Sequence, residues 1–217
     1  MHDHDDVRSR SPLWERISPP WQACLEEAVG AMRAGNLAIG AAVVDPGGEI
    51  VGRGGNRLRK AGTRREVIAG TPLAHAEVYA IADAAREEPA GRVLDLYSTV
   101  EPCPLCTGAA VMGPIRSIHF ASYDPWAGAT TLLRGSAYTR GKPIAVIHPQ
   151  DSELADVCTA FHVLSLLLAF PEVERTPGAA MNEVMSALAH ASPVGVELGY
   201  TIARDADVRK RLRDSAV

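Results

Sequence analysis

The spacing of apolar residues along the chain alternates between the period of helices and the period of strands. Residues 19–35 (PPWQACLEEAVGAMRAG) carry apolar side chains three or four positions apart, which predicts an amphipathic helix. Two short apolar runs follow with the turn sequence DPGG between them, so residues 38–54 are predicted to form a β-hairpin. Residues 56–72 lack a convincing period and predict a long loop.

Helical and strand-like patterns then alternate along the chain. We predict a helix at 75–89, a strand at 93–100, a helix at 103–113, a strand at 116–122, a loop or short helix at 124–135 and a strand at 143–149. This alternation predicts an α/β fold in which helices cover both faces of the sheet. Specifically, we expect a three-layer α/β/α sandwich around a mixed, mostly parallel five-stranded sheet.

The pattern changes after residue 150. A helix that begins there is apolar on all sides, and such a helix must be buried. A linker and two further helical segments, at 181–190 and 196–212, complete the chain. We therefore divide the chain into a flexible N-terminal tail at 1–19, one catalytic domain at 20–150 and a C-terminal helical extension at 151–217.

Composition narrows the class of protein. With 217 residues, 47% hydrophobic and 22% charged, the chain is typical of a soluble globular protein. Its first residues are charged, and no run reaches 18 uninterrupted apolar residues, so we expect no signal peptide, no membrane span and a cytoplasmic location. A net charge of -4 provides no general attraction to nucleic acid, although residues 56–65 form a local basic patch.

Two thiols and an imidazole form a candidate metal site. Cys103 and Cys106 lie three positions apart at a predicted helix start, and His75 lies at the start of another helix. Imidazole and thiolate ligands suit zinc, and a site with three protein ligands is typical of catalytic zinc. Cys24 or Cys158 would be needed to close a structural four-ligand site, which is the alternative.

The segments HAE and PCPLC together fit the zinc deaminase signature. The sequence resembles the cytidine and deoxycytidylate deaminase superfamily, especially its branch of guanine deaminases and bacterial tRNA adenosine deaminases. The similarity is carried by PLAHAE, TVEPCPLCTGA and DPWAGA, and it covers residues 21–148.

This resemblance implies hydrolytic removal of an amino group from a base. Zinc would be held by His75, Cys103 and Cys106, and would activate water as the nucleophile. Glu77 would carry protons between the water, the base and the departing ammonia. Contacts to the base are expected from three further residues: Asn56, Ala76 and Trp126. Of the other polar residues near the motifs, we expect His119 to pack within its strand and Glu101 to order a loop.

The substrate remains open among several classes. A purine base or nucleoside of the guanine type is the leading expectation. Adenosine in tRNA is the alternative, with the basic segments 56–65 and 209–213 on phosphates. Cytosine or cytidine, and a zinc-stabilised interaction subunit without catalysis, are further alternatives. The resemblance also implies a homodimer, and we expect residues 57–71 and the C-terminal helices to narrow the entrance to the site.

Overall fold

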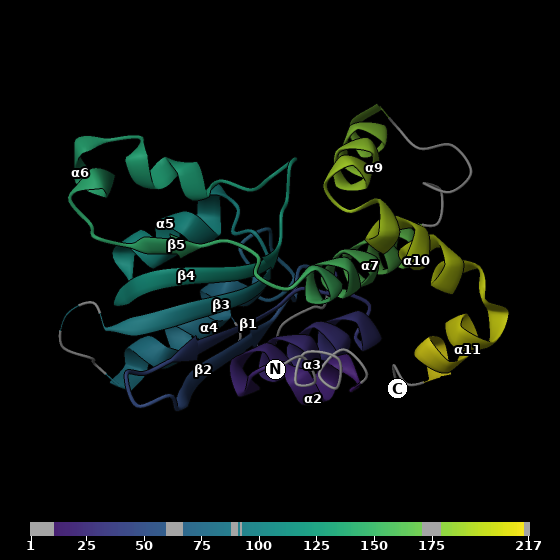
Figure 1. The fold of residues 1–217 in the computed structure, drawn as a ribbon, viewed down its shortest axis with the longest axis horizontal. Helices are drawn as coiled ribbons and strands as arrows, with labels where there is room; N and C mark the ends of the chain where they lie inside the picture. The colour runs from purple at the N-terminus through teal and green to yellow at the C-terminus, as the bar shows by residue number, and fades with distance from the viewer. Residues whose placement is uncertain (1–10, 60–66, 88–90, 92, 171–178, 215–217) are drawn as a thin grey trace, which may run out of the picture.

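The computed structural model of this protein describes residues 11–59, 67–87, 91, 93–170 and 179–214. A five-stranded sheet forms its centre, in the order β2-β1-β3-β4-β5 (Figure 1). The strands are β1 (Gly40–Val44), β2 (Ile50–Gly55), β3 (Leu94–Val100), β4 (Ile115–Ser122) and β5 (Ala145–Ile147). β1 is antiparallel to both of its neighbours, whereas β3, β4 and β5 run parallel. The mixed five-stranded sheet is therefore confirmed.

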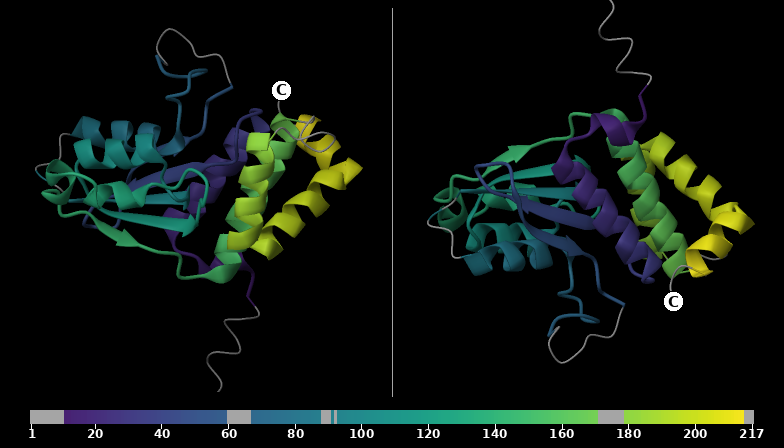
Figure 2. Two further views of the ribbon diagram at one scale, coloured as in Figure 1. Left: turned by 90° about the horizontal axis from the view of Figure 1, so that it is seen from above. Right: turned by 90° about the horizontal axis from the view of Figure 1, so that it is seen from below.

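Helices cover both faces of the sheet, as the predicted three-layer sandwich requires. α4 (Ala76–Ala84) and α5 (Pro104–Met112) lie on one face, and α3 (Pro19–Arg33) and α7 (Ser152–Ala169) lie on the other (Figures 1 and 2). The main core lies between the sheet and the first pair and includes Leu96, Ile118 and Phe120, all almost fully buried.

The remaining helical elements connect and extend this sandwich. They are α2 (Leu13–Arg16), η1 (Ala85–Glu87), η2 (Thr130–Arg134), α6 (Ala137–Arg140), α9 (Ala179–Ala191), α10 (Pro193–Arg204) and α11 (Ala206–Asp214). The single helix predicted at 196–212 is wrong, because the chain breaks at Asp205. The Asp205 carboxylate accepts hydrogen bonds from the backbone N–H groups of Asp207 (2.9 Å) and Val208 (3.0 Å), which starts α11 as a new helix.

The apolar helix predicted after residue 150 is α7, and its burial is confirmed. It packs against α3, against β4 and against α10. By length and composition α7 would be able to cross a membrane, but 56% of that 18-residue window is buried inside the protein. Burial of this kind is typical of a core helix.

Two segments bear on the predicted division of the chain. In the N-terminal segment, Arg16 of α2 forms ion pairs with Asp151 (3.6 Å) and Glu153 at the start of α7. The described residues on either side of 60–66, between β2 and α4, project from the side of the molecule that carries α4 (Figure 2). Residues 60–66, including much of the predicted basic patch, lie outside the described residues. The three-part division stays a prediction.

Candidate metal centre and active site

The three predicted zinc ligands meet at the N-termini of two neighbouring helices. His75 is the N-cap residue of α4 and Cys103 is the N-cap residue of α5, with Pro104 in the first turn. Proline suits this position because the missing N–H group has no partner within a helix start. Cys106 lies one turn further along α5 and is fully buried. These side chains form the one group of metal-ligand type within the described part of the chain.

The spacing of the three ligand atoms fits zinc. The two cysteine sulfurs are 3.6 Å apart, and each lies 3.5 Å from the Nδ1 atom of His75. A tetrahedral zinc ion about 2.3 Å from sulfur and about 2.0 Å from nitrogen would separate sulfur from sulfur by about 3.8 Å and sulfur from nitrogen by about 3.5 Å. The protein therefore already holds these atoms at the distances that zinc requires, and zinc is its cofactor.

The protonation of the two thiols is coupled because they share a hydrogen bond. The contact between the two sulfurs is the main cause that lowers the pKa of Cys103 to about 4, and the nearby His75 ring acts in the same direction. The same contact raises the pKa of Cys106 above its usual range, and burial adds to that effect. The Cys103 sulfur in turn raises the pKa of His75. The site thus favours one thiolate before any metal binds.

Glu77 lies in the first turn of α4, and its side chain is buried beside the ligands. Its Oε2 atom accepts a hydrogen bond from the Cys106 sulfur at 3.1 Å. Its Oε1 atom accepts one from the hydroxyl of Ser98, also at 3.1 Å. Burial is the main cause that raises the pKa of Glu77. A carboxyl group in this position can exchange protons with a molecule held next to the ligands.

Ser98 was not predicted from the sequence. It lies on β3, on the same side of the strand as Leu94 and Leu96, and it is completely buried. A hydroxyl at the third inward position of an otherwise apolar series is a detectable signal, because buried polar groups need partners. Its partner, Glu77, lies on a different element, and the sequence does not reveal that pairing.

The predicted base-contacting residues occupy different settings. Asn56, directly after β2, is 1% exposed, and its Oδ1 atom accepts a hydrogen bond from the N–H group of Leu58 at 3.1 Å. The Nδ2 atom of Asn56 has no hydrogen-bond partner among the described residues. The backbone N–H group of the next residue, Arg57, donates a hydrogen bond to the carbonyl of Ala74 (2.9 Å), which directly precedes the N-cap residue of α4, so Asn56 lies close to the start of that helix. Ala76 is fully buried in its first turn.

Trp126 lies on the loop after β4 and is 49% exposed. This loop is fixed to the start of α5, because the N–H group of Ala129 donates to the carbonyl of Pro102 at 2.9 Å. Glu101 helps to order it by accepting a hydrogen bond from the hydroxyl of Thr130 at 2.7 Å. The indole ring of Trp126 is therefore carried on a loop anchored next to Cys103.

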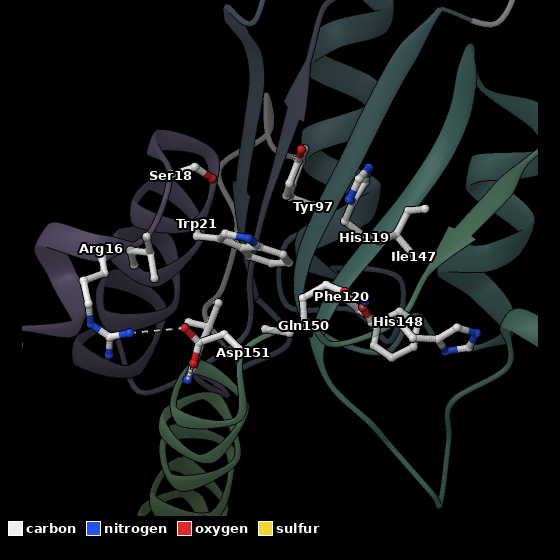
Figure 3. Close-up of a pocket in the computed structure, with 13 residues that line it drawn as sticks. Arg16, Ser18, Trp21, Tyr97, His119, Phe120, Ile147, His148, Gln150 and Asp151 are labelled. Atoms are coloured by element: carbon white, nitrogen blue, oxygen red, sulfur yellow. Dashed lines mark hydrogen bonds and ion pairs between the residues drawn. The ribbon is translucent and has the colours of Figure 1, made fainter. Parts of the chain in front are cut away.

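The face of the sheet that carries α3 holds a separate cavity of about 310 Å³ (Figure 3). Its wall includes Trp21, Tyr97 and His119, and neither the metal ligands nor Glu77 lines it. The His119 ring stacks on Tyr97 with centroids 4.3 Å apart. His119 of β4 thus packs against the neighbouring strand β3 and lies outside the ligand group, in line with the expectation of a packed strand residue.

The other two cysteines lie outside the ligand group. Cys24 and Cys158 are buried, and burial is the main cause that raises the pKa of each thiol. The described part of the chain therefore supplies three ligands of this group, His75, Cys103 and Cys106.

Comparisons with known proteins agree with this geometry. Residues 19–122 match the family described as the cytidine and deoxycytidylate deaminase zinc-binding region. The chain is 35% identical over 111 residues to a tRNA-specific adenosine deaminase of Bacillus subtilis, covering 50% of this chain and 63% of that protein. It is 34% identical over 127 residues to a tRNA-specific adenosine deaminase of Haemophilus influenzae, covering 58% of this chain and 67% of that protein.

The fold has been seen in a solved structure as well. Guanine deaminase from Nitrosomonas europaea superimposes with a TM-score of 0.50 at 20% identity, covering 69% of this chain and 85% of that one. The match to the family region, a relative covered over two thirds of its length and the shared sheet lead to one conclusion. This chain belongs to the cytidine and deoxycytidylate deaminase family of zinc-binding proteins.

Proposed function

We propose that this chain is a zinc-dependent hydrolytic deaminase that converts adenosine to inosine within tRNA. The observation that carries deamination is the buried Glu77 carboxyl group, which lies against a triangle of ligand atoms at zinc-binding distances. The choice of tRNA is supported by two relatives, both tRNA-specific adenosine deaminases at 34–35% identity. This choice replaces the guanine-type substrate that the sequence alone put first.

The chain's own side chains perform the proton transfers in this proposal. When bound, zinc supplies a Lewis acid that makes water a nucleophile near neutral pH. Glu77 takes a proton from the water while the water oxygen forms a bond to C6 of adenine. Glu77 then passes that proton to the ring nitrogen N1. Glu77 then transfers the second water proton to the amino group, the C6–N bond breaks, and ammonia leaves.

Other side chains orient the groups that react. Ser98 holds the Oε1 atom of Glu77, which leaves Oε2 directed toward the ligands. Asn56 offers a buried N–H donor to an acceptor atom of the base, and an unpaired donor of this kind otherwise costs stability. In this proposal Trp126 provides an exposed ring on which a base can stack, and Ala76 forms part of the wall.

The test is an ammonia-release screen with the zinc-loaded full chain. Unmodified tRNA transcripts, adenosine, guanine and cytidine are supplied separately, and the nucleosides of the tRNA are analysed after digestion. We expect ammonia and inosine in equal amounts from tRNA, and neither from the Glu77→Gln variant. If guanine is the only compound that releases ammonia, the proposed substrate changes from adenosine in tRNA to a free purine base. If cytidine is the only one, the proposed substrate changes from a purine to a pyrimidine nucleoside. Release from no substrate would favour a non-catalytic zinc-stabilised subunit.

A free purine base is the second candidate, and one contact favours it. The guanidinium group of Arg59 lies 5.1 Å from the centre of the Phe170 ring at the end of α7. The C-terminal extension therefore touches the segment that begins after Asn56, as expected if the two together narrow the entrance. An enclosed site excludes bulk water around a small base, whereas RNA needs an open entrance. The homodimer implied by the family is part of this proposal, and sedimentation of the purified protein tests it.

A further inference from the structure

A segment beside the proposed active site is free of acidic residues. Residues 125–150 contain no aspartate or glutamate, in a chain that has 26 of them. The same segment carries Arg134, Arg140 and Lys142, which we call the basic strip. The protein is acidic overall, so this segment is a local exception to its charge.

The basic strip lines a single groove. A groove of about 600 Å³ lies between η2, α6 and the edge strand β5, and all three cations contribute to its wall. Figure 1 shows α6 above β5, beside α5. Arg134 and Arg140 are exposed, and Lys142 is half-buried. The three positive charges therefore converge on one surface.

Carboxylates do not neutralise these charges within the described residues. Arg140 donates a hydrogen bond to the carbonyl of Arg134 at 3.0 Å, and the Lys142 ammonium lies 4.8 Å from the centre of the Tyr138 ring. Both contacts leave the positive charge uncompensated. Three arginines elsewhere in the fold, Arg16, Arg53 and Arg116, are paired with carboxylates, as Arg116 is with Asp95 at 2.8 Å. The basic strip is thus available to an anion.

At Thr130 the wall of the groove is hydrogen-bonded to the segment that leads to the metal ligands. Thr130 is part of the groove wall, and its hydroxyl donates to Glu101 at 2.7 Å. Glu101 lies two positions before Cys103 in the chain. A chain of phosphates that leaves the site beside Thr130 can continue along the groove toward α6.

We propose that the basic strip binds the phosphate backbone of the RNA strand whose target base enters the site beside Glu77. The inference rests on the proposed function and names where that substrate is held. Uncompensated cations lining one groove complement a polyanion, and neutralised phosphates release counterions, which makes binding depend on salt. Arginine and lysine at an edge strand can also prevent sheets from pairing edge to edge, which is the competing explanation.

The experiment measures binding of an unmodified tRNA transcript to the zinc-loaded full chain between 50 and 200 mM salt, a range in which phosphate contacts change affinity strongly. The test variant carries Arg134→Gln, Arg140→Gln and Lys142→Gln. The matched control carries three changes at exposed cations elsewhere: Arg33→Gln, Arg86→Gln and Arg204→Gln. Zinc content and thermal unfolding verify that both variants remain folded. If the test variant unfolds, the single variant Arg134→Gln replaces it. Arg134→Lys, which keeps the positive charge, is then its control.

We expect the slope of log affinity against log salt to become shallower by about 2 to 3 in the test variant, which corresponds to about 0.7 to 0.9 for each lost phosphate contact. The control variant, with the same net charge, should keep the parent slope. Equal flattening in both variants would overturn the proposal, because net charge alone would then explain it. Unchanged tRNA binding, with or without self-association of the test variant, would also overturn it.

Two further readouts keep this proposal separate from the proposed function. If the parent protein forms inosine but the test variant keeps the parent salt slope, deamination of tRNA is retained and binding of RNA by the basic strip is rejected. Loss of tRNA binding in the test variant, in a protein that forms no inosine, would retain the strip and reject the activity. Displacement of tRNA by adenosine monophosphate at equal phosphate concentration would assign the strip to a small nucleotide and overturn the RNA proposal.

Discussion

Replacement of Gly54 by alanine should disturb the metal centre by displacing α4. Gly54 lies on β2 directly beneath this helix, and a Cβ atom there would be 2.2 Å from the carbonyl oxygen of Ala76 and 2.8 Å from the nitrogen of Ala80. Ordinary van der Waals contact begins at 3.4 Å, so α4 must retreat from the sheet by about 1.2 Å. The close approach of strand and helix therefore depends on glycine at this position.

The size of the effect follows from that displacement. Forcing an extra methyl group into a packed core costs about 1–3 kcal/mol of stability. His75 and Glu77 move with the start of α4, whereas the cysteine ligands belong to α5. A misplacement of about 1 Å can cost about 100-fold in catalytic efficiency. We expect a loss of that order in kcat/KM, together with weaker zinc binding.

Gly52→Ala is the matched control. Its added Cβ atom would lie equally close, 2.2 Å, to a carbonyl of α4, but at Ala80, one turn further from the ligands. Denaturant unfolding with a chelator present measures stability without the contribution of bound zinc. Zinc titration and kcat/KM then report on the site. We expect similar losses of stability in the two variants and a larger loss of zinc affinity for Gly54→Ala. Parent-like stability and zinc affinity in Gly54→Ala would refute the reasoning.

Three more predictions concern Glu77 and Ser98 at the site and Asp95 near the start of β3. Glu77→Gln should retain zinc and its unfolding temperature but lose about 100-fold to 10,000-fold in kcat, as measured by ammonia release. Ser98→Ala should lower kcat by about tenfold and leave the zinc stoichiometry unchanged, and Ser98→Thr, which keeps the hydroxyl group, should restore kcat. Loss of zinc from Ser98→Ala would contradict a positioning role for Ser98. The hydrogen bond from Arg116 is the main cause that lowers the pKa of Asp95 below its ordinary value of 3.8. The ionised Asp95 therefore stabilises the fold above pH 3.8, and this stabilisation is lost as the pH falls through the lower pKa of the folded state. Asp95→Asn should therefore cost about 0.2–1 kcal/mol at pH 7, and urea unfolding at pH 3 should give a smaller difference.

Much of the fold could be predicted because its signals are local. The first helix, the hairpin and the strands were expected within a few residues of where they lie, since apolar spacing and turn residues mark them directly. The last strand is shorter than predicted and covers only Ala145–Ile147, because the prolines at both ends of the predicted run cannot donate ladder hydrogen bonds. The break at Asp205 was missed because an aspartate within a helical period gives the same apolar pattern whether or not it caps a new helix.

The candidate site divides in the same way. The zinc ligands could be predicted because they lie in two short motifs, each at the start of one helix: His75 at α4, and Cys103 with Cys106 at α5. The fold only has to bring these two helix starts together. The contact of Ser98 with Glu77 joins β3 to α4. The contact of Arg59 with Phe170 joins residues more than a hundred positions apart. Contacts of this second kind depend on tertiary packing, which no local pattern encodes.

Removing the C-terminal extension would not test the proposal that it narrows the entrance to the site. Leu154 and Cys158 of α7 pack with Leu25 of α3 and Ala121 of β4 in one buried cluster. The hydroxyl of Ser165 also accepts a hydrogen bond from the backbone of the chain just before β1, at 2.8 Å. Truncation after residue 150 would therefore expose the face of the sheet that α7 covers, and loss of folding would hide any change in specificity. Phe170 lies at the end of α7, only partly buried, so changing this ring alone alters the contact with the segment before α4 while the cluster under α7 stays intact. The contrast between an enclosed base and an open RNA site therefore rests on that contact and on the basic strip, both outside the zinc motif.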